Sequence, residues 1–192
     1  MSRTIQASGR WIRRLRQQDV KLPQVDAIEI YQEEFGESDI ACGVIRDFYR
    51  HWRALAGSRD MPTMSEVDAV TIPRHVLPYI CVVDVTEEGR FKYRVAGTKL
   101  VEGCGMEVTG RFVDEMAGTE GIERRLRRLL RTRKPYHCIV PLTWSTMTYK
   151  HYESVVCPLA DPRTEAVGRM IGAGWFDIPF DSGPLAAVAP RA

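Results

Sequence analysis

Apolar side chains recur at steps of three and four residues in two parts of the chain, residues 40–56 and residues 120–134. This spacing places them on one face of an α-helix. Asp39 is positioned to cap the first helix, Gly57 to stop it, and Pro135 to end the second. The apolar residues are Ile40, Val44, Ile45, Phe48, Trp52 and Leu55 in the first helix, and Ile122, Leu126, Leu129 and Leu130 in the second.

Five shorter stretches have the β-branched or alternating pattern of strands. They are residues 79–85, 91–96, 136–144, 149–159 and 167–176. Glu87, Glu88 and Gly89 predict a hairpin turn between the first two, and the glycine-rich residues 98–119 predict short helical turns. The order of two strands, helices and three strands predicts an α+β fold, in which five antiparallel strands form a sheet with helices over one face.

The two ends of the chain differ from this domain in composition. Residues 1–22 hold six Lys and Arg against one Asp, with a short basic amphipathic segment around Trp11. Residues 23–39 hold six Asp and Glu and no Lys or Arg, and residues 27–35 predict an acidic helix. Prolines after residue 177 predict a flexible tail. We divide the chain into an N-terminal extension (1–39), one domain (40–177) and a C-terminal tail (178–192).

Composition narrows the function classes. The 192 residues include 27 Lys and Arg against 25 Asp and Glu, so the net charge of +2 gives no reason to expect nucleic-acid binding. No apolar run reaches the roughly 18 residues of a bilayer-spanning helix, and the N-terminus lacks the apolar stretch of a secretory signal. Five scattered cysteines argue against a disulfide framework. We expect a cytoplasmic protein with reduced thiols and no integral membrane association.

The sequence lacks the motifs of common enzymes. It contains neither the G-x-S-x-G of a hydrolase nor the G-x-x-x-x-G-K-[ST] of a phosphate-binding loop. Gly103, Gly105 and Gly110 do not have the spacing of a dinucleotide fingerprint, and the four histidines lack a partner at metal-ligand spacing. We therefore predict no catalytic residues, no metal site and no enzyme activity.

The order of elements resembles that of the PAS domain, and local motifs resemble its small bacterial branch, the PAS-5 type of single-domain proteins found in alphaproteobacteria. The motifs are WR at 52–53, RDMP at 59–62, HVLPYICVVD at 75–84, FKYRVAGT at 91–98, VTGR at 108–111 and YESVVCPL at 152–159. The resemblance covers residues 40–177. It implies a sensory or interaction module, and it does not imply one particular ligand.

The resemblance allows three cofactors to be tested. Light-sensing flavin members resemble one another in an N-C-R-F-L-Q motif, but here Cys104 lies in G-C-G and the chain has no Asn. Haem-sensing members commonly supply a histidine from the long helix, which here has none, while His137 lies on the following strand. No residues next to the cysteines in the sequence support a cysteine-linked chromophore. The cofactor is unknown, with no support for haem, covalent flavin or metal.

A noncovalent pocket between the helices and the concave face of the sheet is what remains. Side chains alternate between the two faces of each strand, and the mixed aromatic and small polar residues of one face suit a small, partly polar molecule. The alternative is that these side chains simply fill the core. The predicted ligand-binding residues are Tyr93, Val95, Cys138, Val140, Tyr152 and Ser154.

The long helix is also strongly basic. Arg124, Arg128 and Arg131 lie on one of its faces, which predicts contact with an acidic partner, an anionic ligand or the acidic residues 26–39. The alternative is a solvated face whose cations suit the C-terminal end of the helix dipole.

Two functions follow. The first is a non-enzymatic sensory module that binds a small molecule and regulates a signalling protein in trans. The alternative is a ligand-free adaptor that acts only by dimerisation and protein docking. We expect a homodimer through the N-terminal helices, on the basis of the apolar stripe in residues 40–55 and of family analogy.

Overall fold

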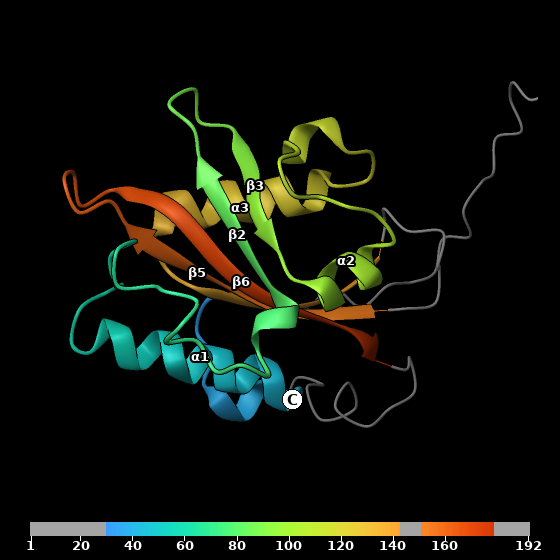
Figure 1. The fold of residues 1–192 in the computed structure, drawn as a ribbon, viewed down its shortest axis with the longest axis horizontal. Helices are drawn as coiled ribbons and strands as arrows, with labels where there is room; N and C mark the ends of the chain where they lie inside the picture. Colours follow the sequence, from blue (N-terminus) through green and yellow to red (C-terminus); the bar gives the residue numbers. More distant parts are fainter. Residues whose placement is uncertain (1–29, 143–150, 179–192) are drawn as a thin grey trace, which may run out of the picture.

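The protein is described by a computed structural model that places residues 30–142 and 151–178. Its centre is an antiparallel sheet in the order β1-β4-β5-β6-β2-β3 (Figure 1). The predicted basic segment around Trp11 and nearly all of the predicted tail lie outside the described residues. The strands are β1 (Ile30–Gln32), β2 (Ile80–Val85), β3 (Phe91–Ala96), β4 (Tyr136–Pro141), β5 (His151–Ala160) and β6 (Val167–Ile178).

Within residues 30–142 and 151–178, three α-helices and three single 3₁₀ turns accompany the sheet. The helices are α1 (Gly43–Ala56), α2 (Thr98–Cys104) and α3 (Glu120–Thr132), and the turns are η1 (Glu37–Asp39), η2 (Leu77–Tyr79) and η3 (Val113–Glu115). The predicted α+β class is confirmed. The turn at Gly89, where φ is +74°, closes the predicted hairpin between β2 and β3.

In the part of the chain that the structure describes, the sheet has six strands instead of the predicted five, because β1 forms where the acidic helix of residues 27–35 was expected. Ile30 and Tyr31 pair with Ile139 and Cys138 of β4. The Tyr31 ring lies against that of Tyr136, with centroids 5.3 Å apart. The free edge of β4 offers backbone hydrogen bonds that a short isolated helix would lack, since helices of this length are marginal in water. The helix prediction was wrong for residues 30–35.

The prediction that helices cover only one face of the sheet was also wrong. Figure 1 shows α1 below the sheet and α3 above it. Adjacent residues of β5 point in opposite directions: Tyr152 is hydrogen-bonded to Arg125 of α3, while Glu153 accepts hydrogen bonds from the backbone just before α1. Each of the two helices therefore covers a layer of core on its own face of the sheet.

Helix α1 begins three residues later than predicted. Its N-cap is Cys42, and Asp39 instead accepts a hydrogen bond from the Gly36 amide in η1, at 2.7 Å. Gly57 ends the helix with a φ of +60°, as predicted. The apolar stripe of α1 is buried against the sheet of its own chain, with Phe48 and Trp52 almost fully covered. The stripe is therefore not the exposed dimer surface that the sequence suggested.

The β2–β3 ladder contains a bulge that changes the facing of one predicted site residue. Tyr93 pairs with Val83, but Val95 pairs with Val82, so Arg94 is an extra residue in β3. A bulge of this kind reverses the alternation of side chains beyond it. Val95 is consequently 43% exposed, whereas Tyr93 is buried.

Two glycines fix the place of α2 against the sheet. A Cβ atom on Gly97 would lie 2.3 Å from the carbonyl oxygen of Pro78, and one on Gly103 would lie 2.2 Å from the ring of Phe176. Neither contact is sterically possible. The helix can therefore lie directly on Phe176 of β6, which brings Leu100 and Cys104 over the sheet.

Candidate ligand cavity

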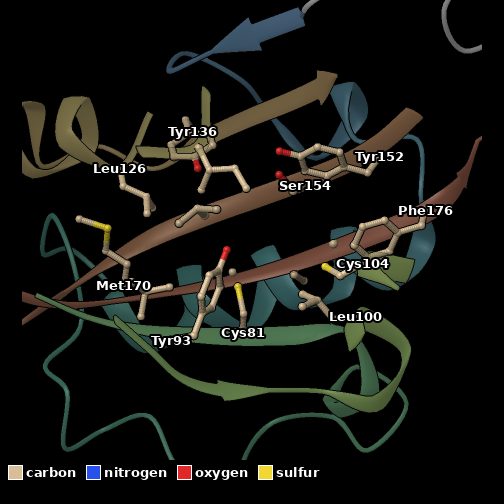
Figure 2. A pocket seen from close by; sticks show the side chains of 16 residues that line it. Cys81, Tyr93, Leu100, Cys104, Leu126, Tyr136, Tyr152, Ser154, Met170 and Phe176 are labelled. Carbon is tan, nitrogen blue, oxygen red and sulfur yellow. The ribbon is translucent and has the colours of Figure 1, made fainter. Parts of the chain in front are cut away.

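A cavity of about 60 Å³ lies between the sheet and helices α2 and α3. Figure 2 shows side chains from both layers directed into it. The walls are mainly apolar, and no Asp or Glu is among the described residues that line them. The lining residues are Cys81, Val83, Tyr93, Leu100, Cys104, Ile122, Leu126, Tyr136, Tyr152, Ser154, Val156, Met170, Gly172, Ala173, Gly174 and Phe176.

Three tyrosines supply most of the polarity of this cavity. Tyr93, Tyr136 and Tyr152 come from β3, β4 and β5, and Figure 2 shows their hydroxyl groups turned toward the space between sheet and helices. Tyr152 Oη accepts a hydrogen bond of 2.6 Å from Arg125 Nη2. In the part of the chain that the structure describes, the hydroxyls of Tyr93 and Tyr136 have no hydrogen-bond partner.

Burial raises the pKa of all three phenols well above its ordinary value. The neighbouring thiols and phenols add to this effect, while the Arg125 guanidinium opposes it. The charged form is disfavoured because a phenolate would lose its hydration in this apolar space. The tyrosines are therefore neutral O–H groups, available as donors or acceptors, at any physiological pH.

The Cys81 thiol of the cavity is also held in its neutral form. Burial, helped by the nearby Cys104, raises the pKa of the Cys81 thiol to about 12. Because the thiolate is the nucleophilic form, Cys81 is protonated at neutral pH. Behind the wall, Cys138 Sγ lies 3.2 Å from Ser154 Oγ in a buried polar contact.

Three of the six predicted ligand-binding residues line the cavity: Tyr93, Tyr152 and Ser154. Cys138 and Val140 belong to the same face, because they pair with Ser154 and Tyr152 across the β4–β5 ladder. They are buried beside the cavity without lining it. Val95 lies elsewhere, because the bulge at Arg94 turns it to the opposite face.

The sequence prediction missed Tyr136 and Arg125. Tyr136 has the same strand alternation as Cys138 and Val140, so the pattern that selected those two could also have found it. Arg125 was not singled out among the cations of the long helix, although it lies three residues after Ile122 and four before Leu129, within the buried stripe of α3. The helical spacing of Arg125 from Ile122 and Leu129 could have identified it as buried, but its positive charge suggested an exposed residue.

The opposite face of the sheet holds a buried hydrogen-bond network. His137 Nε2 lies 2.8 Å from Glu153 Oε1, and both side chains are at most 1% exposed. Glu153 also accepts hydrogen bonds of 2.8 Å from the backbone amides of Ala41 and Cys42, which lead into α1. His137 Nδ1 lies 3.3 Å from Gln32 Oε1 of β1. One carboxylate thus joins β1, β4, β5 and the start of α1.

The three predicted partner-binding arginines do not share one environment. Arg128 forms a 2.7 Å ion pair with Glu33 and lies over the Tyr31 ring, 5.0 Å from its centroid. It therefore contacts the chain's own acidic segment, one of the three partners that the sequence left open. Arg124 and Arg131 lie on the exposed side of α3, in a shallow groove with Leu130. Neither has an ion pair within residues 30–142 and 151–178.

Within residues 30–142 and 151–178, no group of three His, Cys, Asp or Glu side chains is arranged to hold a metal ion. Within the same residues, no helix combines the length and apolar character required to cross a membrane.

A family model described as the PAS domain matches residues 43–173. The match covers more than half of the chain, and the protein belongs to the PAS domain family, whose members are signalling and sensory modules. No curated protein is similar enough in sequence to match.

Several solved structures are similar in fold. The PAS domain of the histidine kinase ThkA is 13% identical, with 50% of this chain and 97% of that chain covered and a TM-score of 0.39. An RNA-binding light-oxygen-voltage receptor is 15% identical, with 60% and 35% covered and a TM-score of 0.42. The LOV domain of the blue-light photoreceptor Aureochrome1 is 13% identical, with 59% and 91% covered and a TM-score of 0.41. At such identities the similarity concerns the fold alone.

Proposed function

We propose that this protein is a non-enzymatic, cytoplasmic sensory module that binds a small molecule in the cavity beneath α2 and α3 and regulates a signalling protein in trans. The observation that carries the proposal is the cavity itself, where the Tyr93 and Tyr136 hydroxyls have no partner among the described residues. Buried hydroxyl groups in proteins are nearly always hydrogen-bonded. A bound molecule, or water held in its place, would supply the missing partners.

Native mass spectrometry of freshly purified protein tests this function. We expect a reproducible additional mass that disappears on denaturation, or a melting temperature that rises with ligand concentration. Gly174→Val should suppress both, because its Cβ has room beside Phe176 and Leu100 while its methyl groups occupy the cavity. Val95→Ala, off the cavity, is the control and should change neither. Empty spectra together with no thermal shift across a metabolite panel would reject the proposal.

Regulation in trans requires a surface that a partner can reach. Arg124 and Arg131 supply positive charge on the exposed side of α3, while the cavity-lining Ile122 and Leu126 lie on its other side. A ligand that displaces α3 would therefore move this surface, which couples binding to docking if the two arrangements differ in affinity. Charge reversal at Arg124 and Arg131 should abolish capture of an acidic partner, whereas reversal at the exposed Arg163 should not.

The homodimer also stays a proposal. Because the stripe of α1 is buried, a dimer requires another surface, and light scattering on the purified chain measures the mass directly. A monomer at all concentrations would remove dimerisation from the mechanism.

A ligand-free adaptor is the second candidate, and the small size of the cavity favours it. A volume of about 60 Å³ is well below the roughly 300 Å³ at which ordinary ligand pockets begin. On this alternative, ordered water satisfies the tyrosines, and the domain acts through its outer surfaces alone. Absence of any bound organic molecule, with partner capture intact in Gly174→Val, would select it.

A catalytic role receives no support from the thiols of the cavity. The raised pKa of Cys81 leaves it protonated, and Cys104, the other thiol in the lining, is also buried. Incubation with substrates of acyl and phosphoryl transfer should therefore yield no turnover.

A further inference from the structure

We propose that the ligand of this cavity is a compact molecule with an apolar body and one hydrogen-bond-accepting carbonyl oxygen, which the hydroxyl groups of Tyr93 and Tyr136 bind together. This inference rests on the proposed function, since it names the chemical class of the molecule that the same cavity takes. A carboxylate and a ketone both present such an oxygen, and the experiment below distinguishes them.

The donor set defines the polar end of the ligand. Tyr93 and Tyr136 enter from strands at different positions in the sheet, and both hydroxyls face the cavity without a partner in the described chain (Figure 2). A phenol can donate one hydrogen bond, so two of them can converge on the two lone pairs of a single carbonyl oxygen. An acceptor is therefore the group that satisfies both at once.

The charged groups around the cavity favour a hydrogen-bond acceptor as the polar group of the ligand and disfavour a cation. Arg125, only 6% exposed, reaches the cavity wall, where it donates to Tyr152 Oη. No described carboxylate lines the cavity. An ammonium group would therefore lose its hydration without gaining a counter-ion, which is costly in an apolar interior. A carbonyl oxygen meets donors only.

The volume and the remaining walls define the body of the ligand. A water molecule needs roughly 10–15 Å³ of such space, and an apolar cavity of about 150 Å³ takes up benzene. The cavity of about 60 Å³ therefore has room for only a few heavy atoms. Its other walls are aliphatic or aromatic, notably Val83, Leu126, Met170 and Phe176. A short branched or cyclic carbon skeleton matches both properties.

The experiment uses four small probes with the full chain in NMR titrations: acetate, acetone, isopropylamine and xenon. The first three share a branched frame of the same size and differ in the polar group, while xenon tests only whether apolar space is present. We expect acetate or acetone, or both, to perturb residues of the cavity, xenon to do the same, and isopropylamine to have no effect. Binding of only one of the two carbonyl probes tells the carboxylate from the ketone.

Single-hydroxyl variants test the two donors. Tyr93→Phe and Tyr136→Phe should each weaken the carbonyl probe by roughly three- to tenfold, the range of one hydrogen bond, and leave xenon affinity unchanged. Tyr79→Phe is the matched control, because Tyr79 lies against Trp175 and is absent from the cavity lining. It should alter neither affinity.

The outcomes separate the two proposals. Three results would overturn the inference and leave the cavity as a binding site: xenon binds but neither carbonyl probe does, isopropylamine binds more tightly than the carbonyl probes, or both variants keep their affinity for the carbonyl probe. No perturbation by any of the four probes overturns the inference and counts equally against the proposed function. Carbonyl binding that both variants weaken supports both proposals.

Discussion

The two faces of the sheet treat buried polar groups in opposite ways. Under α1, the Glu153 carboxylate is fully buried and contacts His137 and two backbone amides. Under α2 and α3, two phenols project into a cavity and leave their hydroxyls unpartnered within the described residues. A face whose polar groups bind one another is rigid, while a face with unused donors offers them to another molecule. On our proposal, the α1 face of the sheet stabilises the fold and the α2–α3 face binds the ligand.

The largest effect should come from the carboxylate on the α1 face. Glu153→Gln removes the charge beside His137 and turns an amide donor toward a backbone N–H, so we expect a loss of about 3 kcal/mol in the free energy of unfolding. Urea denaturation measures it. Glu66→Gln is the matched control, because Glu66 also accepts a backbone hydrogen bond, from Thr63 at 2.7 Å, but is partly exposed. If both variants lost a similarly small amount of unfolding free energy, the buried hydrogen bonds of Glu153 would not be what stabilises this face.

A smaller loss should follow from Trp52 on the same face. Trp52 Nε1 donates a hydrogen bond of 3.1 Å to the carbonyl oxygen of Pro158 in β5. Trp52→Phe leaves that buried oxygen without this donor and creates a small void, which we expect to cost about 2 kcal/mol. Thermal unfolding followed by circular dichroism gives the value. A variant as stable as the natural chain would show that water replaces the indole donor.

The α1 face should also be sensitive to mild acid. Burial lowers the pKa of His51 below the 6.5 of an unfolded histidine. Above pH 6.5 the imidazole is neutral in both the folded and the unfolded state and does not change the free energy of unfolding. Below pH 6.5 the unfolded chain binds the proton more readily, so the free energy of unfolding decreases as the pH is lowered. His51→Gln should reduce the difference in unfolding free energy between pH 7.5 and pH 5.5. An unchanged difference would mean that His51 is hydrated in solution.

The smallest effect on stability should come from the cavity tyrosines. Because their hydroxyls have no partner in the described chain, Tyr93→Phe and Tyr136→Phe remove no internal hydrogen bond, and we expect changes within about 0.5 kcal/mol. The same urea series measures them. A loss above about 1 kcal/mol would reveal a structural role for the hydroxyl and would erase the contrast between the two faces.

Local patterns in the sequence were sufficient for most elements. The 3.6-residue periodicity of α3 and the strict alternation of β3 gave the bounds Glu120 and Phe91–Ala96 as the structure has them. Side-chain alternation also identified Tyr93, Tyr152 and Ser154 as members of one face. These features depend only on residues that are near one another in the chain, so periodicity reports them directly.

What the amino-acid sequence by itself determined is which residues form all but one of the strands and the two long helices, and the family to which the order of these elements belongs. Only the tertiary structure decided the strand at Ile30–Gln32, the burial of α1, the displacement of Val95 and the placement of Tyr93 and Tyr136 around one cavity. Each of these depends on a distant partner: the free edge of β4, the second face of the sheet, or the register of β2 against β3. Local sequence patterns do not identify that partner, because strand pairing and the face to which each side chain points are set only when separate elements pack together.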